Sequence, residues 1–146
     1  MVEGIQIEDR REDSKDESIA PIGDFISLVA GFAAFLFPVT LNWYSREGAY
    51  LKGVDTVVGK ICFALGVAVF VFAIVVLVGR FINPKFRLHR SPGWVYGMSA
   101  SIIFMVSIVA LVAPENIGGI QAGISYGIIL ELFAASAIGV GGLLKF

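Results

Sequence analysis

Residues 57–79 read VVGKICFALGVAVFVFAIVVLVG, and Lys60 is the only charged side chain in this stretch. A helix needs about 20 apolar residues to cross the hydrocarbon core of a bilayer. Three more apolar runs of similar length lie at 22–43, 94–113 and 120–144. A soluble chain of 146 residues could not bury four such helices, whereas a helix in lipid satisfies its own backbone groups. The sequence therefore predicts an all-α membrane protein, a four-transmembrane-helix bundle.

The composition of the chain agrees with this class. Hydrophobic residues make up 57% of the chain and charged residues 16%, an apolar excess over the ~45–50% of soluble domains. The length leaves room for one membrane domain, 21–146, after a polar tail, 1–20. A single cysteine, Cys62, excludes a disulfide within the chain, and its place in an apolar run is typical of an inert buried thiol.

The tail is acidic and has almost nothing apolar to bury. We expect it to be disordered, or at most transiently helical, and cytoplasmic. Two interpretations stay open: a solvated tail, or a segment that docks on a basic partner surface. Acidic residues outnumber the basic residues Arg10, Arg11 and Lys15 of this tail. The acidic residues are Glu3, Glu8, Asp9, Glu12, Asp13, Asp16 and Glu17.

Positive charge predicts the orientation. Lys and Arg gather in the tail and in the middle connection, 80–93, whereas the connection at 114–119 has none. The positive-inside rule therefore predicts a multi-pass protein of the cell membrane with N- and C-termini in the cytoplasm. We expect the basic side chains of the middle connection to contact anionic lipid headgroups, at about 1 kcal/mol each. These side chains are Arg80, Lys85, Arg87 and Arg90.

Small residues predict where the helices meet. Helices in lipid associate by close packing, so Gly, Ala and Ser mark contact faces. Positions four residues apart drift by about 40° per step on an ideal helix, so a neighbour following such a stripe crosses with the opposite hand to a heptad bundle. We expect this contact within the chain, or between subunits of a homo-oligomer or larger membrane complex. The stripe in the fourth run is Gly119, Gly123, Gly127, Ala135 and Gly139.

Glu131 stands near the middle of the run 120–144. A carboxylate at the centre of a bilayer costs ~2.5 kcal/mol or more, so this side chain should face the bundle or a subunit contact. Burial favours the neutral acid, because no Lys, Arg or His lies at matching depth. The expected hydrogen-bond partners are hydroxyls such as Ser99, Ser101 and Ser107. Three interpretations remain: a neutral acid bonded between helices, a proton or cation site, or a contact with a subunit or lipid.

Residues at the ends of the runs predict interfacial contacts. Asp24 is well placed near a helix start, where a carboxylate favours the free N–H groups. Pro38 should bend or end the first helix. Aromatic belts are expected from Trp43, Tyr44 and Tyr50 at one interface and from Trp94 and Tyr96 at the other.

The remaining chemistry is sparse, and we predict no catalytic, cofactor-binding or metal site and no nucleic-acid partner. His89 is the only histidine, and no Cys/His cluster or phosphate-binding loop is present. The favoured hypothesis is a non-catalytic accessory, assembly or self-associating structural subunit in the lipid bilayer. The alternative is a small oligomeric proton- or cation-conducting protein that uses Glu131.

Two resemblances to known proteins are loose. A Glu in the last of four spans, within Ile129-Leu130-Glu131-Leu132, is similar to the proton-carrying Glu of the proteolipid rotor subunits of vacuolar-type ATPases. The chain lacks that family's alternate-residue glycines in the first and third runs, and its tail and predicted orientation differ. The patterns Asn-Trp-Tyr at 42–44, Gly-Val-Asp-Thr at 53–56 and Gly-Gly-Leu-Leu at 141–144 resemble uncharacterised small four-span proteins of microbial membranes. The second resemblance implies no activity.

Overall fold

The computed structural model describes residues 2–145 except 87, 89, 90, 115, 118, 119 and 122, and it describes side chains from Pro21 onward, without those of 115–122. The helices are α1 (Val2–Thr40), α2 (Val57–Ile82), α3 (Pro92–Val112) and α4 (Tyr126–Leu143). The strands are β1 (Asn42–Arg46), β2 (Ala49–Lys52), β3 (Asn116–Ile117), β4 (Ile120–Gln121) and β5 (Gly123–Ile124), and a 3-10 turn spans Gly53–Asp55.

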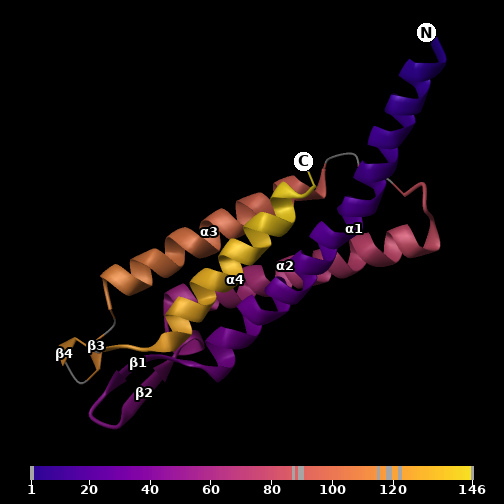
Figure 1. Cartoon of the computed structure of the whole chain (residues 1–146). Coiled ribbons are helices and arrows are strands. Elements are labelled where there is room, and N and C mark those ends of the chain that lie inside the picture. Colours follow the sequence, from indigo (N-terminus) through magenta and orange to yellow (C-terminus); the bar gives the residue numbers. More distant parts are fainter. Residues whose placement is uncertain are drawn as a thin grey trace.

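The helices form an antiparallel bundle (Figure 1). Helix α1 packs against α2 and α4, and α3 packs against α4 and α2. The strands gather at one end of the bundle, which we call the sheet end. The α2–α3 connection and the end of α4 lie at the other, which we call the loop end. Among the described residues, four helical segments are long and apolar enough to cross a membrane: Pro21–Thr40, Val57–Ile82, Pro92–Val112 and Tyr126–Leu143. The predicted helical bundle is therefore confirmed.

Helix α1 is longer than the first apolar run. Its backbone is helical from Val2, so the disorder expected for residues 1–20 is not confirmed. It ends at Thr40, two residues after Pro38, and the chain continues directly into β1. The first apolar run was expected to remain helical to residue 43, but residues from Asn42 onward pair in a sheet instead.

The fourth helix begins at Tyr126, later than the position 120 that hydropathy predicts. Glycine is a poor helix former, and Gly118, Gly119 and Gly123 stand in or just before this segment. Its backbone instead pairs across the bundle: β5 joins a sheet in the order β2-β1-β5, and the Ser125 amide donates to the Trp43 carbonyl at 2.8 Å. Gly123 therefore lies in β5, opposite Ser45, and not on the fourth helix.

The buried positions of the helices follow a heptad rather than the expected steps of four. Alternating steps of three and four are the repeat of left-handed helix bundles, so the expectation of the opposite crossing hand is not supported. On α4 the pairs at 127–128, 134–135 and 141–142 are buried, with 131 and 138 between them. The buried set of α2 is Gly59, Cys62, Gly66, Val69, Ala73 and Val76. That of α3 is Gly93, Tyr96, Ala100, Ile103, Ser107 and Ala110.

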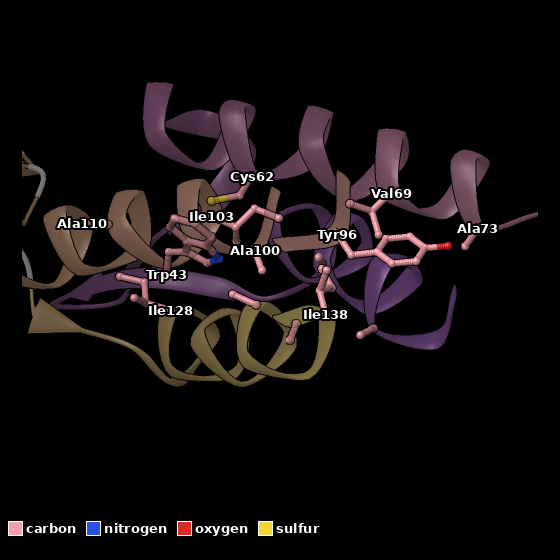
Figure 2. Close-up of a cluster of buried hydrophobic side chains, with 14 of the residues drawn as sticks. Trp43, Cys62, Val69, Ala73, Tyr96, Ala100, Ile103, Ala110, Ile128 and Ile138 are labelled. Carbon is pink, nitrogen blue, oxygen red and sulfur yellow. The ribbon is translucent and has the colours of Figure 1, made fainter. Parts of the chain in front are cut away.

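Three of the five aromatic residues expected at the interfaces belong to the core. Trp43, Tyr44 and Tyr96 are fully buried, and Figure 2 shows Trp43 and Tyr96 among the core side chains. The Tyr44 hydroxyl donates to the Ala110 carbonyl at 2.8 Å. Strand β1 turns back over the sheet end of the bundle, so its aromatic side chains point inward. Tyr50 and Trp94 remain 63% and 60% exposed, as a belt requires.

Candidate functional site

A buried ionic cluster joins all four helices at the loop end. The carboxylate of Asp24, on α1, accepts a hydrogen bond from the Tyr96 hydroxyl of α3 at 3.0 Å. Lys145 Nζ, just beyond α4, lies 2.6 Å from Asp24 Oδ2, and an Arg80 guanidinium nitrogen of α2 lies 3.4 Å from the same oxygen. We call these four residues the Asp24 cluster. Antiparallel helices bring the start of the first span, the end of α2, the start of α3 and the end of α4 to one level.

The charges of the Asp24 cluster are enclosed to different degrees. The Asp24 side chain is fully buried, that of Lys145 is 2% exposed and that of Arg80 is 31% exposed. Burial lowers the pKa of Lys145, and the hydrogen bond to Asp24 opposes this effect. The Ser91 hydroxyl, which caps α3, donates to the Lys145 carbonyl at 3.1 Å, so the backbone there is also held.

Two sequence expectations change at this cluster. Asp24 lies well inside α1, which begins at Val2, so its carboxylate binds side chains rather than the free N–H groups of a helix start. Arg80 was expected to face lipid headgroups, but its guanidinium reaches inward to Asp24. Lys85 is exposed, and its headgroup contact stays a prediction. Arg87 and Arg90 lie outside the described residues.

Glu131 is the second buried carboxyl group. It lies on the second turn of α4, nearer to the sheet end than to the loop end of this helix, because the helix starts late. Its side chain is fully buried, and neither carboxyl oxygen has a hydrogen-bond partner within the described part of the chain. The expected serine partners are not found: the Ser101 hydroxyl donates to Gly97, and Ser107 contacts Cys62.

Other polar side chains lie at the same depth as Glu131. Cys62 and Ser107 each lie on the second turn from the sheet end of their own helices, α2 and α3, with Sγ and Oγ 3.8 Å apart. Trp43 enters this region from β1, and its indole N–H also lacks a partner among the described residues. We call Glu131, Trp43, Cys62 and Ser107 the Glu131 layer.

Within the Glu131 layer, Trp43 lies on the sheet-end side of Glu131. Its ring packs between glycines, because a Cβ added to Gly53 would lie 2.7 Å from Trp43 Cε2 and one added to Gly127 would lie 2.8 Å from Trp43 Cδ1. The Gly127 Cβ would also lie 2.6 Å from the Asn42 carbonyl oxygen. Gly127 therefore lies on a packing face as expected, but its neighbour is β1 rather than another helix.

An apolar belt separates the Glu131 layer from the Asp24 cluster. Its side chains come from every helix and fill the middle of the bundle (Figure 2). The belt contains only aliphatic side chains, so the two polar sites are not connected by side-chain hydrogen bonds among the described residues. Its fully buried or nearly buried members are Ala30, Ala34, Val69, Ala100, Ala134, Ala135, Ile103 and Ile138.

The outer face of α3 and α4 carries a groove lined by small residues. A cavity of about 320 Å³ lies over it. A Cβ on Gly97 would meet nothing within 4 Å, and one on Gly139 would make an ordinary 3.6 Å contact with Ala100. The hydroxyls of Ser101 and Ser136 donate to carbonyls of their own helices, each at 2.8 Å. This outer groove is lined by Gly97, Ala100, Ser101, Ser136, Gly139, Val140 and Leu143.

The predicted small-residue stripe is thus divided among several environments. Gly127 and Ala135 are buried inside the bundle, Gly139 lines the outer groove, Gly123 lies in β5, and Gly119 lies outside the described residues. The sequence analysis missed the Asp24 cluster. Its signal was present, because Asp24, Arg80 and Lys145 flank apolar runs on what the topology makes one side. Comparison of the chain with protein-family models, curated proteins and solved structures found no match.

Proposed function

We propose that this chain is a non-catalytic integral membrane protein that serves as an accessory, assembly or self-associating structural subunit. The observation that carries this proposal is the outer groove on α3 and α4. The two carboxyl groups of the spans, Asp24 and Glu131, are by contrast buried in the bundle.

The outer groove has the properties that favour a neighbouring transmembrane helix. Helices associate in lipid through van der Waals contact, and small residues let two backbones approach closely. The open space at Gly97 would admit a neighbouring side chain without any change in the bundle. Because Ser101 and Ser136 bond to their own helices, a partner helix would leave neither hydroxyl unpaired. The partner is a second copy of the chain or another subunit of a membrane complex.

The test compares Gly97→Leu with Val109→Leu, a substitution at a 56% exposed site of the same helix that lies outside the groove. Both proteins would be purified in mild detergent, and their mass and co-purifying proteins would be determined. We expect the wild type and Val109→Leu to form the same assembly and Gly97→Leu to lose it. A wild-type protein that is monomeric and free of other subunits would contradict the proposal, as would a Gly97→Leu protein with an unchanged assembly.

The proposal includes an orientation: the chain is a multi-pass protein of the cell membrane, and its loop end faces the cytoplasm. Its support is the excess of Lys and Arg in the tail and the α2–α3 connection. Single cysteines at the exposed positions Asn83 and Tyr50 would report the two ends of the bundle. In a Cys62→Ala background, an impermeant thiol reagent added to intact cells should label the Tyr50→Cys protein and leave Asn83→Cys unlabelled. The reverse pattern would invert the topology.

Proton or cation conduction through an oligomer is the second candidate, and one observation favours it: the enclosed carboxyl group of Glu131 has no partner among the described residues. The apolar belt argues against it, since a pathway needs polar groups at successive depths. Reconstituted vesicles would decide the point. Proton flux above that of protein-free vesicles, lost in Glu131→Gln, would favour conduction over the structural role.

A further inference from the structure

We infer that Glu131 is a proton-binding site that exchanges its proton with the sheet side only, and that Trp43 and strand β1 form its cover. The inference concerns the interior of the bundle, so it goes beyond the structural role proposed above and does not rest on the outer groove. It depends on three features: an enclosed carboxyl group, a short path to one end of the bundle, and a cover that pairs with β5 at two positions.

The enclosure of Glu131 favours the protonated form. Its side chain is fully buried and its two oxygens accept no hydrogen bond from any described residue. An ionised carboxylate in such surroundings would have no hydrogen-bond donor and no cation among the described residues to stabilise it, which disfavours the charged form. The closed bundle therefore holds the neutral acid.

The titratable groups around Glu131 do not change this conclusion. From α2 the facing group is Cys62, which contacts Ser107. From β1 it is Tyr44, whose hydroxyl is bonded to Ala110. The part of α1 beyond Asp24 and the part of α3 beyond Tyr96 contain no ionisable side chain. Lys60 of α2 is exposed, and neither it nor Arg46 of β1 donates a hydrogen bond to the Glu131 carboxyl group.

The proton can reach Glu131 from one side. At a rise of 1.5 Å per residue, Glu131 lies about 7 Å along α4 from the first residue of that helix at the sheet end. In the opposite direction the apolar belt fills the middle of the bundle, and the buried Ser27 of α1 lies between the belt and the Asp24 cluster. On the sheet side, Trp43 and β1 pack against Gly127, one turn of α4 before Glu131.

Few backbone pairings join the cover to the segment before α4, in addition to the Tyr44–Ala110 hydrogen bond and the pairing of β1 with β2. Strand β1 pairs with β5 at two positions, Tyr44 with Ile124 and Ser45 with Gly123. One further bond, from the Ser125 amide to the Trp43 carbonyl, fixes the residue that carries the indole ring. Displacement of Trp43 would expose Glu131 to water and stabilise its carboxylate. Ionisation and displacement of the cover are therefore linked.

The sign of the pH dependence follows from this linkage. The closed bundle binds one proton at Glu131 that the opened or unfolded chain releases more readily, so stability falls as the pH rises. A Trp94→Phe background leaves Trp43 as the only tryptophan. In this background the purified protein would be titrated from acidic to basic pH, with the thermal midpoint and the Trp43 emission recorded.

We expect the midpoint to fall and the Trp43 emission to shift to longer wavelength as the pH rises. Glu131→Gln, which keeps the size of the side chain but cannot ionise, should abolish both changes. Cys62→Ala is the matched control, because it removes the other ionisable group of the layer, and it should retain both changes. A response that persists in Glu131→Gln, or that disappears in Cys62→Ala, would overturn the inference.

Two measurements keep the inference testable if Glu131→Gln fails to fold. The carbonyl infrared band of a protonated carboxylic acid should be present in the wild type at neutral pH and disappear over the pH range in which the Trp43 emission shifts. A band that is absent at neutral pH would contradict a proton bound at Glu131. Vesicles that contain the wild type should pass protons no faster than empty vesicles, and faster passage would contradict access from one side.

Discussion

Asp24 and Glu131 are both fully buried carboxyl groups of the same bundle, yet their surroundings differ completely. Asp24 accepts a hydrogen bond from Tyr96 and is paired with Lys145 and Arg80. Glu131 has neither a hydrogen bond nor a cation within the described residues. The difference arises from where the basic side chains point, because Arg80 and Lys145 reach Asp24 at the loop end whereas Lys60 near the sheet end is exposed.

The comparison teaches that two buried acids of one protein can have opposite effects on its stability. A carboxylate that is paired with two cations stabilises the packing of the elements that carry them, and its loss leaves buried positive charge. A neutral acid without partners contributes unsatisfied polar atoms, and its loss removes them.

The largest effect should come from Asp24→Ala. Removal of one partner of a buried ion pair typically costs 3–5 kcal/mol, and because Arg80 is partly exposed we expect a loss of about 3 kcal/mol in the free energy of unfolding. Thermal and detergent-induced unfolding would measure it. Lys85→Ala, at an exposed basic residue outside the cluster, is the control and should change stability little. A loss below about 1 kcal/mol would place the Asp24 cluster among weak surface pairs.

The next largest effect on stability should come from Gly127→Ala. Its Cβ would lie 2.6 Å from the Asn42 carbonyl oxygen, so β1 or α4 must shift, at a cost of about 2 kcal/mol. Gly139→Ala on the same helix is the matched control, since its Cβ would make an ordinary contact. Equal unfolding midpoints for the two variants would mean that β1 does not pack closely on α4, and that Glu131 is not covered.

Tyr96→Phe tests the hydrogen bond within the Asp24 cluster. The change keeps the ring in the core and removes a donor to a charged acceptor, which typically costs about 1.5 kcal/mol. Tyr50→Phe, at an exposed residue, should have no effect on the unfolding midpoint. If Tyr96→Phe costs the same in an Asp24→Ala background as in the wild type, the two residues are not coupled.

Glu131→Met should have the smallest effect and the opposite sign. The substitution keeps the length of the side chain and removes two buried polar atoms without partners, so we expect a gain of about 1 kcal/mol in stability at neutral pH. The same unfolding measurement would detect the gain. A clear loss would show that the carboxyl group makes a stabilising interaction, and the contrast with Asp24 would then disappear.

The sequence predicts the helical architecture well, because apolar runs of this length have a single stable solution in lipid. It also predicts the burial of Glu131, because a carboxyl group exposed to lipid is costly. It fails at the sheet end, because hydropathy predicts a helix from residue 120, whereas the chain forms the short strands β4 and β5 before α4 begins.

The partners of the buried acids were harder to predict. Hydrogen bonds from Ser99, Ser101 or Ser107 to Glu131 were expected from depth alone, but a hydroxyl can bond to its own helix, as Ser101 does. Trp43 was expected at an interface because it follows an apolar run. Its burial depends on the pairing of β1 with β5, a long-range contact that no local pattern shows.

The long-range contacts that close the two ends of the bundle, Asp24 with Lys145 and β1 with β5, also constrain the order in which the protein can assemble. Lys145 follows Asp24 by 121 residues, and the partners of β1 in β5 likewise come after three helices have been made. Pairing of α1 with α2 needs only a short connection and can precede both closures. During synthesis, Asp24 can pair with Arg80 once α2 is made, but its closer contact with Lys145 forms only after all four helices have left the ribosome.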